Sequence, residues 1–405
     1  MKTKIHGKTY DLTKFKHPGG SIPINLCDGK DGTALFESYH PVSDRQMLNR
    51  ILEKYEIPND STIQSDTIYD YTIFNDDFTK ELRTQVYAYF EILAEKNKCS
   101  LIKATKMTTE MKITVNIFFL CFLVSTYLYI NRTLLGLILF PVSLWFLAIN
   151  TYHDMSHYAF SQYRLLEYIL SPLQLFLYPP YSWNADHVYT HHSYSNVIPV
   201  DTDLQRYIGF YQNIENKSNF ISTICEVLFF SDKSIDKYRI KKSDICQTIV
   251  YVFMRIVFLK ITIYDSLING LTVYNLIYGL LPILCFAILF LMFTQVNHIH
   301  TENFTGSPHF YKHQIMTATN IKTDSYLMRI LSGGLNCQIE HHLFPSVNSC
   351  HLPEIAKIVK PLCVKYNILY NEYSSFSTAL YDTWKTSKKI NSKTIGNFNF
   401  KINNA

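Results

Sequence analysis

Fifteen histidines occur in the 405-residue sequence, and the spacing of eight of them is its most informative chemical feature. Seven fall in the motifs H-D-M-S-H, H-V-Y-T-H-H and Q-I-E-H-H, and the eighth follows a long apolar run. Histidines four apart project from one face of a helix. Buried imidazoles are unfavourable unless paired or metal-bound, and one zinc ion would use only three or four of them. The set therefore predicts a two-metal site. Its candidate ligands are His153, His157, His187, His191, His192, His298, His341 and His342.

Ligands that are almost all neutral nitrogen leave the positive charge on the metal, unlike the carboxylate-rich cages of ferritin-like proteins. Iron with open coordination positions can bind and reduce dioxygen. An oxidant of that kind can remove hydrogen from an unactivated methylene, which no amino-acid side chain can do. Acidic residues beside the motifs could orient the imidazole N–H groups, or could simply be solvated charges. These acids are Asp154, Asp186, Asp201, Asp203 and Glu340.

Long apolar runs indicate the elements that must position the histidines. The sequence is 47% hydrophobic and 15% aromatic, and these residues concentrate in stretches long enough to cross a bilayer. Two hairpins would return the chain to the same side before each group of motifs, and flanking lysines mark that side as cytosolic. Because the motifs lie outside the apolar runs, a transporter is disfavoured. The predicted crossings are 113–130, 134–150, 247–264 and 271–296.

The remaining segments are predicted to lie outside the membrane or in its interface. Short apolar runs and turns in 1–57 predict a small α+β domain. The segment 58–77 is polar and offers little to a core, so it is predicted to be a linker. Residues 78–96 predict an amphipathic helix. The segment 161–183 is broken by three prolines and is predicted to be interfacial. Two further expectations are an extramembrane excursion at 198–246 and a disordered tail at 388–405.

The net charge, the cysteine spacing and the N-terminal sequence argue against several classes of protein. No apolar segment begins in the first 30 residues, so no secretory signal is expected. The nine cysteines form no C-x-x-C pair, which indicates reduced thiols and neither a disulfide framework nor a thiolate zinc site. A net charge of +5 gives no reason to expect nucleic acid as a partner.

The three motifs, in this order, resemble the histidine boxes of membrane fatty acid desaturases. The stretch S-G-G-L-N-C-Q-I-E-H-H-L-F-P at 332–345 is the most specific match, and Gln338 in place of a histidine is similar to the front-end subgroup. His298 in Q-V-N-H-I resembles the extra ligand of the family. The resemblance implies a mostly α, four-crossing membrane fold over 78–387 with a cytosolic histidine cap that holds two non-haem iron ions. Gln338 is carried over as a further catalytic-site candidate.

The N-terminal segment resembles the haem-binding core of cytochrome b5, through H-P-G-G at 17–20 and F-E-S-Y-H at 36–40. Pro18 fixes a turn, and Gly19 and Gly20 permit close approach of the backbone to a flat macrocycle. The resemblance implies a haem b with His17 and His40 as axial ligands. A six-coordinate iron of this kind suits electron transfer.

Together the two resemblances imply an oxygen-dependent front-end desaturase of long-chain polyunsaturated acyl chains, bound to coenzyme A or to phospholipid. Three residues separate His187 from the His191–His192 pair, a spacing that resembles the subset of the family that acts at Δ5 or Δ4. Electrons would pass from NAD(P)H through a cytochrome b5 reductase to the haem, which the linker would hold at high effective concentration. The implied location is the endoplasmic reticulum membrane, with the haem domain and the histidine boxes in the cytosol.

Three alternatives remain open at this stage. A sphingolipid long-chain-base desaturase resembles the same architecture, haem domain included. A hydroxylase could use the same oxidant, although Q-I-E-H-H is less like the hydroxylase pattern. A haem electron carrier on an inert anchor would leave the eight aligned histidines unexplained.

Overall fold

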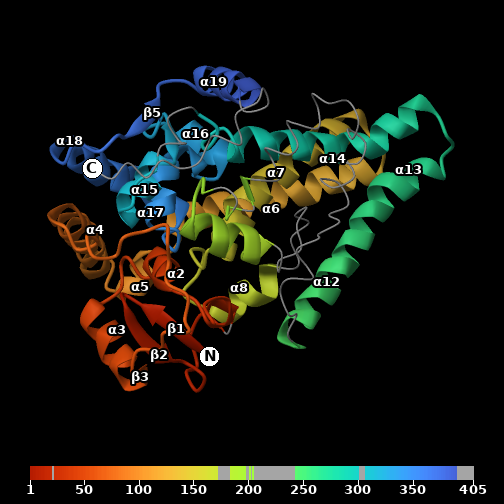
Figure 1. Cartoon of the computed structure of the whole chain (residues 1–405). Helices are drawn as coiled ribbons and strands as arrows, with labels where there is room; N and C mark the ends of the chain where they lie inside the picture. Colours follow the sequence, from red (N-terminus) through yellow and green to blue (C-terminus); the bar gives the residue numbers. More distant parts are fainter. Residues whose placement is uncertain are drawn as a thin grey trace.

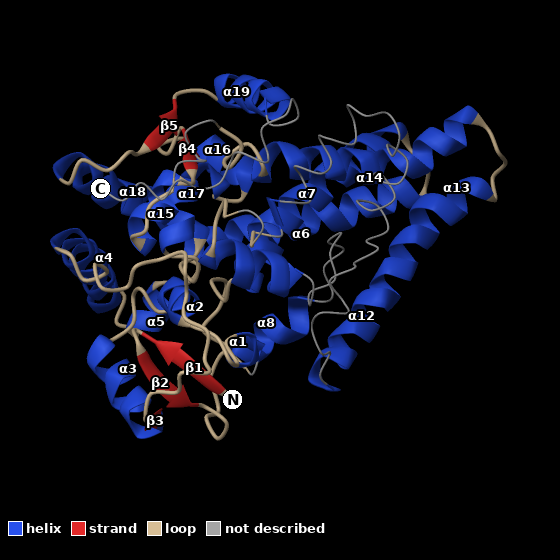
Figure 2. Cartoon of the chain, viewed as in Figure 1, coloured by secondary structure: helices blue, strands red, loops and turns tan. Residues whose placement is uncertain are grey.

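In a computed structural model, the described part of the protein is mostly helical and contains two small sheets (Figure 2). The described residues are 1–20, 22–171, 183–197, 200–201, 203–204, 242–300 and 306–389. Helical membrane segments, a small N-terminal α+β domain and a helical cap are all present, so the predicted fold class is confirmed.

The N-terminal domain is built on an antiparallel sheet in the order β1-β2-β3, in which the end of the domain pairs back onto its second strand. Ile5, Tyr10 and Leu12 fill its small core. Asp44 caps the third helix by accepting hydrogen bonds from two backbone N–H groups. The elements are β1 (Lys2–Ile5), β2 (Lys8–Asp11), α1 (Ile22–Leu26), α2 (Thr33–Tyr39), α3 (Arg45–Leu52), η1 (Glu53–Tyr55) and β3 (Glu56–Ile57).

The segment 58–77 packs against the rest of the protein, so the prediction that it offers little to a core is wrong. Tyr69 and Phe74 are buried in the core of the cap. The Tyr69 ring stacks on Tyr194 with centroids 5.7 Å apart, and its hydroxyl donates to the Ser193 carbonyl over 2.9 Å. The aromatic residues of the segment 58–77 determine how it packs despite its polar composition, because they lie where two domains meet.

The amphipathic helix predicted for 78–96 is present as α4 (Asp77–Lys96), and Asp76 caps it through the Thr79 N–H. Its apolar face, which includes Leu82 and Val86, is buried. A short helix, α5 (Leu101–Ala104), then leads to the first membrane segment.

Within the described residues, four helices are long and apolar enough to cross a membrane, as predicted. The second continues six residues beyond its predicted end at 150, to Ser156, and so carries the first histidine motif in its last turn. The third runs unbroken to Leu267, so the connection predicted for 265–270 begins later. The helices are α6 (Thr109–Ile130), α7 (Leu134–Ser156), α12 (Lys242–Leu259) continued by η5 (Lys260–Tyr264) and α13 (Asp265–Leu267), and α14 (Val273–Thr294).

Figure 1 shows α6, α7 and α14 side by side, whereas α12 diverges from α14 away from the hairpin that joins them. The outer face of α6 exposes Ile117, Leu120 and Val124, as expected for a surface in contact with lipid. Inside the group, the Tyr129 and Tyr278 hydroxyls each donate to the carbonyl of the other residue over 2.7 Å. These bonds tie α6 to α14.

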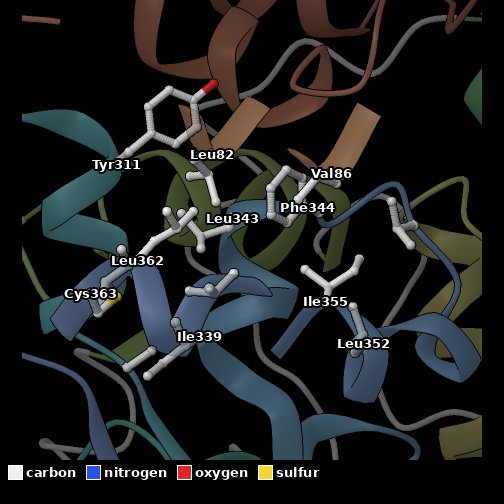
Figure 3. Packing of buried hydrophobic residues seen from close by; sticks show 14 of the residues in the cluster. Leu82, Val86, Tyr311, Ile339, Leu343, Phe344, Leu352, Ile355, Leu362 and Cys363 are labelled. Atoms are coloured by element: carbon white, nitrogen blue, oxygen red, sulfur yellow. The ribbon is translucent and has the colours of Figure 1, made fainter. Parts of the chain in front are cut away.

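The cap follows α14 and closes over one end of the membrane helices. Its short strands pair in parallel, and its helices share a core with α4, in which Leu82 and Val86 meet Ile339, Leu343 and neighbours from the last helices (Figure 3). This core fixes α17 by its apolar face. The elements are α15 (Phe310–Met316), β4 (Thr319–Ile321), α16 (Tyr326–Ser332), η7 (Leu335–Cys337), α17 (Gln338–Leu343), η8 (Ser349–His351), α18 (Leu352–Lys365), β5 (Asn371–Tyr373) and α19 (Phe376–Lys389).

Three predictions fall wholly or partly on residues outside the described ranges. Of the segment 161–183, the described part forms α8 (Arg164–Leu170), which is too short to cross a bilayer, and 172–182 is not described. Most of the excursion 198–246 and of the tail 388–405 also lies outside the described residues.

Candidate metal centre

The eight histidines come from four parts of the chain and meet in one buried cluster. His153 lies in the last turn of α7, and His157 ends that helix. The second motif lies on η3 (Asn184–His191), His298 follows α14, and the third motif lies on α17. All eight side chains are buried. Since α17 buries Ile339 and Leu343 in the cap core, its histidines face the other way, into the cluster.

The second motif is a π-helix and not the α-helix that its spacing suggested. A π-helix joins residue i to residue i+5, so His187 can share a face with His192 as well as with His191. The ring centroids of His187 lie 5.3 Å from His191 and 5.1 Å from His192. Single turns of this kind are frequent at functional sites.

The cluster divides into two groups, each compact enough to hold one metal ion. The first contains four histidines and the second three, and in each group one ligand atom per residue lies within 4.8 Å of the others. His192 lies between the groups, with ring centroids 4.4 Å from His157 and 4.4 Å from His342. The groups are His153, His157, His187 and His341, and His191, His298 and His342.

The donor atoms fit metal ions, because many of them are buried and lack a hydrogen-bond partner among the described residues. They include Nε2 of His157, His187, His341 and His342, and both ring nitrogens of His192. Burial, followed by repulsion between neighbouring imidazoles, lowers the pKa of His157, His192 and His341 well below the ordinary value. Neutral imidazoles with unused lone pairs are what a transition metal binds. Two metal ions would satisfy atoms that otherwise lose hydrogen bonds to water.

Hydrogen-bond partners outside the cluster fix the orientation of the histidine rings. Nδ1 of His187 lies 2.9 Å from Asp203, and Nδ1 of His191 lies 2.8 Å from Asp201. A carboxylate can only accept here, so each imidazole presents Nε2 to the cluster. Burial works against charge on His191, but Asp201 outweighs it and raises the pKa of His191. Two of the five predicted acids therefore support candidate ligands directly.

The other three acids have different surroundings. Asp154 accepts from the Asn348 amide and the Ser349 hydroxyl, and one of its oxygens lies 3.7 Å from Nδ1 of His153. Glu340 accepts from Asn320 and Tyr370, and burial raises the pKa of Glu340 to about 7. Asp186 is buried on η3.

Two further supports for the candidate ligands could not be predicted from the sequence. The Gln314 side-chain oxygen lies 3.0 Å from Nδ1 of His342, and the Thr317 carbonyl lies 3.2 Å from Nδ1 of His298. Neither residue belongs to a recognisable motif.

We expect Asp201→Asn to lower the non-haem iron content or the affinity for that iron by about 10–100-fold, as loss of an outer-shell carboxylate does in other metal sites. Asn keeps one acceptor oxygen but loses the charge that holds the His191 N–H. Metal analysis of purified protein after titration with a chelator measures the effect. Glu354→Gln, on the exposed face of α18, is the control and should retain its iron. Equal iron retention in both variants would contradict the assignment.

Gln338 lies beside the second group. Its side-chain amide is 2.8 Å from Nε2 of His298, and its oxygen lies 3.3 Å from the Asn297 amide nitrogen. In the hydrogen-bonded arrangement the amide occupies the lone pair of His298. A half-turn of the amide would present its oxygen to the same place, where it could serve as a weak ligand.

The N-terminal domain offers a second, separate metal position. The ring centroids of His17 and His40 lie 6.0 Å apart. Metal–imidazole bonds are about 2 Å long, so this spacing admits one iron between the two rings. The Phe36 carbonyl lies 2.8 Å from Nδ1 of His40, which leaves Nε2 as the donor atom. Glycine suits position 19, because a Cβ there would lie 2.9 Å from the His17 ring and would displace it.

Comparison with known families identifies both domains. Residues 131–374 match the family model "Fatty acid desaturase", and residues 3–59 match "Cytochrome b5-like Heme/Steroid binding domain". The chain belongs to the fatty acid desaturase family and carries a cytochrome b5-like domain, as the motifs indicated. It is a membrane protein and an oxidoreductase of fatty acyl lipids, and its N-terminal domain implies a haem.

Curated relatives resemble the chain over almost its whole length. A "Probable Delta(5) fatty acid desaturase C" from Dictyostelium discoideum is 27% identical over 93% of this chain and 88% of its own. An "Acyl-lipid (8-3)-desaturase" from Physcomitrium patens is 26% identical over 95% and 87%. A "Delta(8)-fatty-acid desaturase 2" from Arabidopsis thaliana is 24% identical over 91% and 85%. Relatives at similar identity thus carry different positional names, so similarity alone leaves the position of the double bond open.

Proposed function

We propose that this protein introduces a double bond into long-chain polyunsaturated fatty acyl chains, at Δ5, by an oxygen-dependent reaction at two iron ions. One observation carries the proposal: eight buried histidines from distant parts of the chain converge, and six of them have ring nitrogens without a hydrogen-bond partner among the described residues. This donor set has the number and chemistry that two ions need.

Each group of residues has a definite part in this proposal. The first histidine group would hold one iron and the second group the other, with His192 between them and Gln338 beside the second. Asp203 and Asp201 keep Nε2 of His187 and His191 directed inward. The iron pair would supply the oxidant, formed from dioxygen, that removes two hydrogens from adjacent carbons. Burial of the site excludes bulk water from that oxidant.

The cytochrome b5-like domain would supply the electrons. A reductase would pass them from NAD(P)H to the haem held by His17 and His40, and the haem domain would pass them on. Lys103 and Lys112 flank the first crossing on the side where the histidines and the haem domain lie, which favours a cytosolic orientation. We place the protein in the endoplasmic reticulum membrane, where such a reductase and acyl lipids would meet it.

Two observations together favour Δ5, of which the first supports Δ5 and Δ4 equally. The second motif has three residues between His187 and the His191–His192 pair, the spacing that suggested Δ5 or Δ4 from the sequence. The Dictyostelium relative carries a Delta(5) name. The acyl carrier, coenzyme A or phospholipid, is a separate question for the experiment.

We expect a host that expresses the chain and is fed C20 acids with a first double bond at Δ8 to accumulate products with an added Δ5 bond. Gas chromatography and mass spectrometry of the total lipids locate the bond, and separated acyl-CoA and phospholipid pools identify the carrier. Cells with the empty vector are the control. New unsaturation in sphingoid bases would identify the sphingolipid enzyme instead, and hydroxylated acids without new double bonds would identify a hydroxylase.

A further inference from the structure

The helix that leads to one candidate haem ligand also contacts the candidate iron ligands. His40 directly follows α2, and the three residues before it each reach the desaturase domain. Glu37 accepts from Arg83 on α4 and from Tyr311 on α15. The Ser38 hydroxyl lies 3.0 Å from the His192 carbonyl.

Tyr39 makes the most informative of these contacts. Its hydroxyl lies 2.7 Å from the Val188 carbonyl and 3.0 Å from Nδ1 of His157. A carbonyl can only accept, so the hydroxyl donates to Val188, and its oxygen accepts from the Nδ1–H of His157. His157 is thereby held in the tautomer whose Nε2 lone pair is free to bind metal, and that Nε2 has no hydrogen-bond partner among the described residues.

The other haem-ligand segment meets the same region. The Tyr158 hydroxyl lies 3.3 Å from the Gly19 carbonyl and 2.9 Å from the Tyr189 hydroxyl. Gly19 is two residues from His17, and Tyr158 directly follows His157. Both candidate haem ligands therefore belong to segments that contact residues within, or next to, the first two histidine motifs.

We propose that Tyr39 is a positioning residue that joins the two metal sites: its hydroxyl fixes His157 and completes a bonded route from His40 to the iron centre. The inference rests on the proposed function. The route consists of the covalent bonds of the adjacent residues His40 and Tyr39 and one hydrogen bond to His157. Electron tunnelling decays less steeply along such bonds than across an empty gap.

The step is a one-electron transfer in which no covalent bond forms or breaks. The haem held by His17 and His40 would supply one electron and become ferric, and one ferric ion held by the histidine groups would accept it and become ferrous. The tyrosine hydroxyl retains its proton throughout, since it serves as a medium and not as a redox carrier.

The test measures this transfer without oxygen or fatty acid. Purified holoenzyme in lipid nanodiscs is kept oxidised and anaerobic, and a photoexcited flavin with a sacrificial amine donor reduces the haem in a flash. The haem absorbance then reports its reoxidation by the iron centre. The Soret spectrum, the haem midpoint potential and the iron content are measured on every variant.

Two matched variants separate the route from the general stability of the interface. Tyr39→Phe removes the hydroxyl that contacts His157. Tyr69→Phe also removes a buried hydroxyl that joins the N-terminal part to the second motif, but that hydroxyl donates to the Ser193 carbonyl and to none of the eight histidines. We expect Tyr39→Phe to slow haem reoxidation by about tenfold, which corresponds to about 1.4 kcal/mol of activation free energy, and Tyr69→Phe to leave it unchanged.

Every outcome bears on the inference. Slower transfer in Tyr39→Phe alone, with the haem spectrum and potential unchanged, supports it. Loss of non-haem iron from Tyr39→Phe alone also supports it, because the hydroxyl is then needed to hold His157 in place. Equal behaviour of the two variants, fast or slow, overturns it. Failure of the proposed function is distinguishable, since wild-type protein would then contain haem iron only and form no double bond.

Discussion

Replacing His341 with alanine should abolish double-bond formation and remove non-haem iron, while the haem spectrum stays intact. His341 belongs to the first ligand group, and its ring lies 4.6 Å from His153 and 4.8 Å from His157 between centroids. The Nε2 atom of His341 has no hydrogen-bond partner among the described residues. We therefore expect it to bind a metal ion and not to take part in a hydrogen bond within the protein. The haem position is formed by other residues and should be unaffected.

The measurement combines lipid analysis of fed cells with metal analysis and the Soret spectrum of the purified variant. His351→Ala is a matched control, because His351 and His341 are both only 3% exposed and both are buried in the cap. Nε2 of His351 lies 2.9 Å from the Lys106 carbonyl, outside the cluster. The control should lose some stability but keep its iron and its product. Product formation by His341→Ala would refute the assignment of the iron site.

Replacing Glu37 with glutamine should loosen the haem domain from the desaturase domain. Glu37 is fully buried and accepts from Arg45 in its own domain and from Arg83 and Tyr311 across the interface, and it lies 2.7 Å from His6. Removing one partner of a buried ion pair leaves an uncompensated charge and costs about 3–5 kcal/mol. We expect faster hydrogen exchange in α2 and α4 and a lower melting temperature.

The surface pair between Lys2 and Asp60 provides the control for this variant. It lies in the same part of the chain but is solvent-exposed, so Asp60→Asn should change neither hydrogen exchange at the interface nor electron delivery. Unchanged exchange in Glu37→Gln as well would show that the buried cluster does not hold the domains together.

The contribution of Glu37 to the stability of the protein depends on pH, and the groups around its carboxylate determine how. Burial alone would raise its pKa, but the hydrogen bond with His6 and the charges of Arg83 and Arg45 hold the pKa of Glu37 well below its ordinary value of 4.5. A depressed folded pKa means that the stabilisation is fully present above the unfolded pKa and is lost as the pH falls toward the folded one. The difference in melting temperature between wild type and Glu37→Gln should shrink as the pH falls below about 4.5. A difference that grows at low pH would contradict this account.

The sequence allowed the local features of the fold to be predicted. The four crossings and the α4 helix follow from runs and periods of apolar residues, which are properties of a short window. The convergence of the motifs also followed, because two hairpins return the chain to one side. Asp201 and Asp203 could be suspected from their place near the second motif, and they do support His191 and His187.

The contacts between the domains could not be predicted in the same way. Tyr39 and His157 are separated by 118 positions, and neither period nor composition relates them. The core residues of 58–77 were missed because the window is polar on average, whereas Tyr69 and Phe74 alone decide how it packs. The π-helix was missed because an ordinary helix also places His187 and His191 on one face, and only the geometry around His192 distinguishes the two.

The packed connection between the domains has a consequence for how reducing power reaches this enzyme. Tyr69 and Phe74 bury the segment 58–77 in the core of the cap. The N-terminal domain is therefore held in place and would not carry a haem toward a distant electron donor and back. In the proposed function the haem would therefore stay in one place, and the reductase would have to diffuse to it. Supply should then depend on how often reductase molecules collide with the N-terminal domain in the plane of the membrane, and lengthening the connection should bring no gain in turnover.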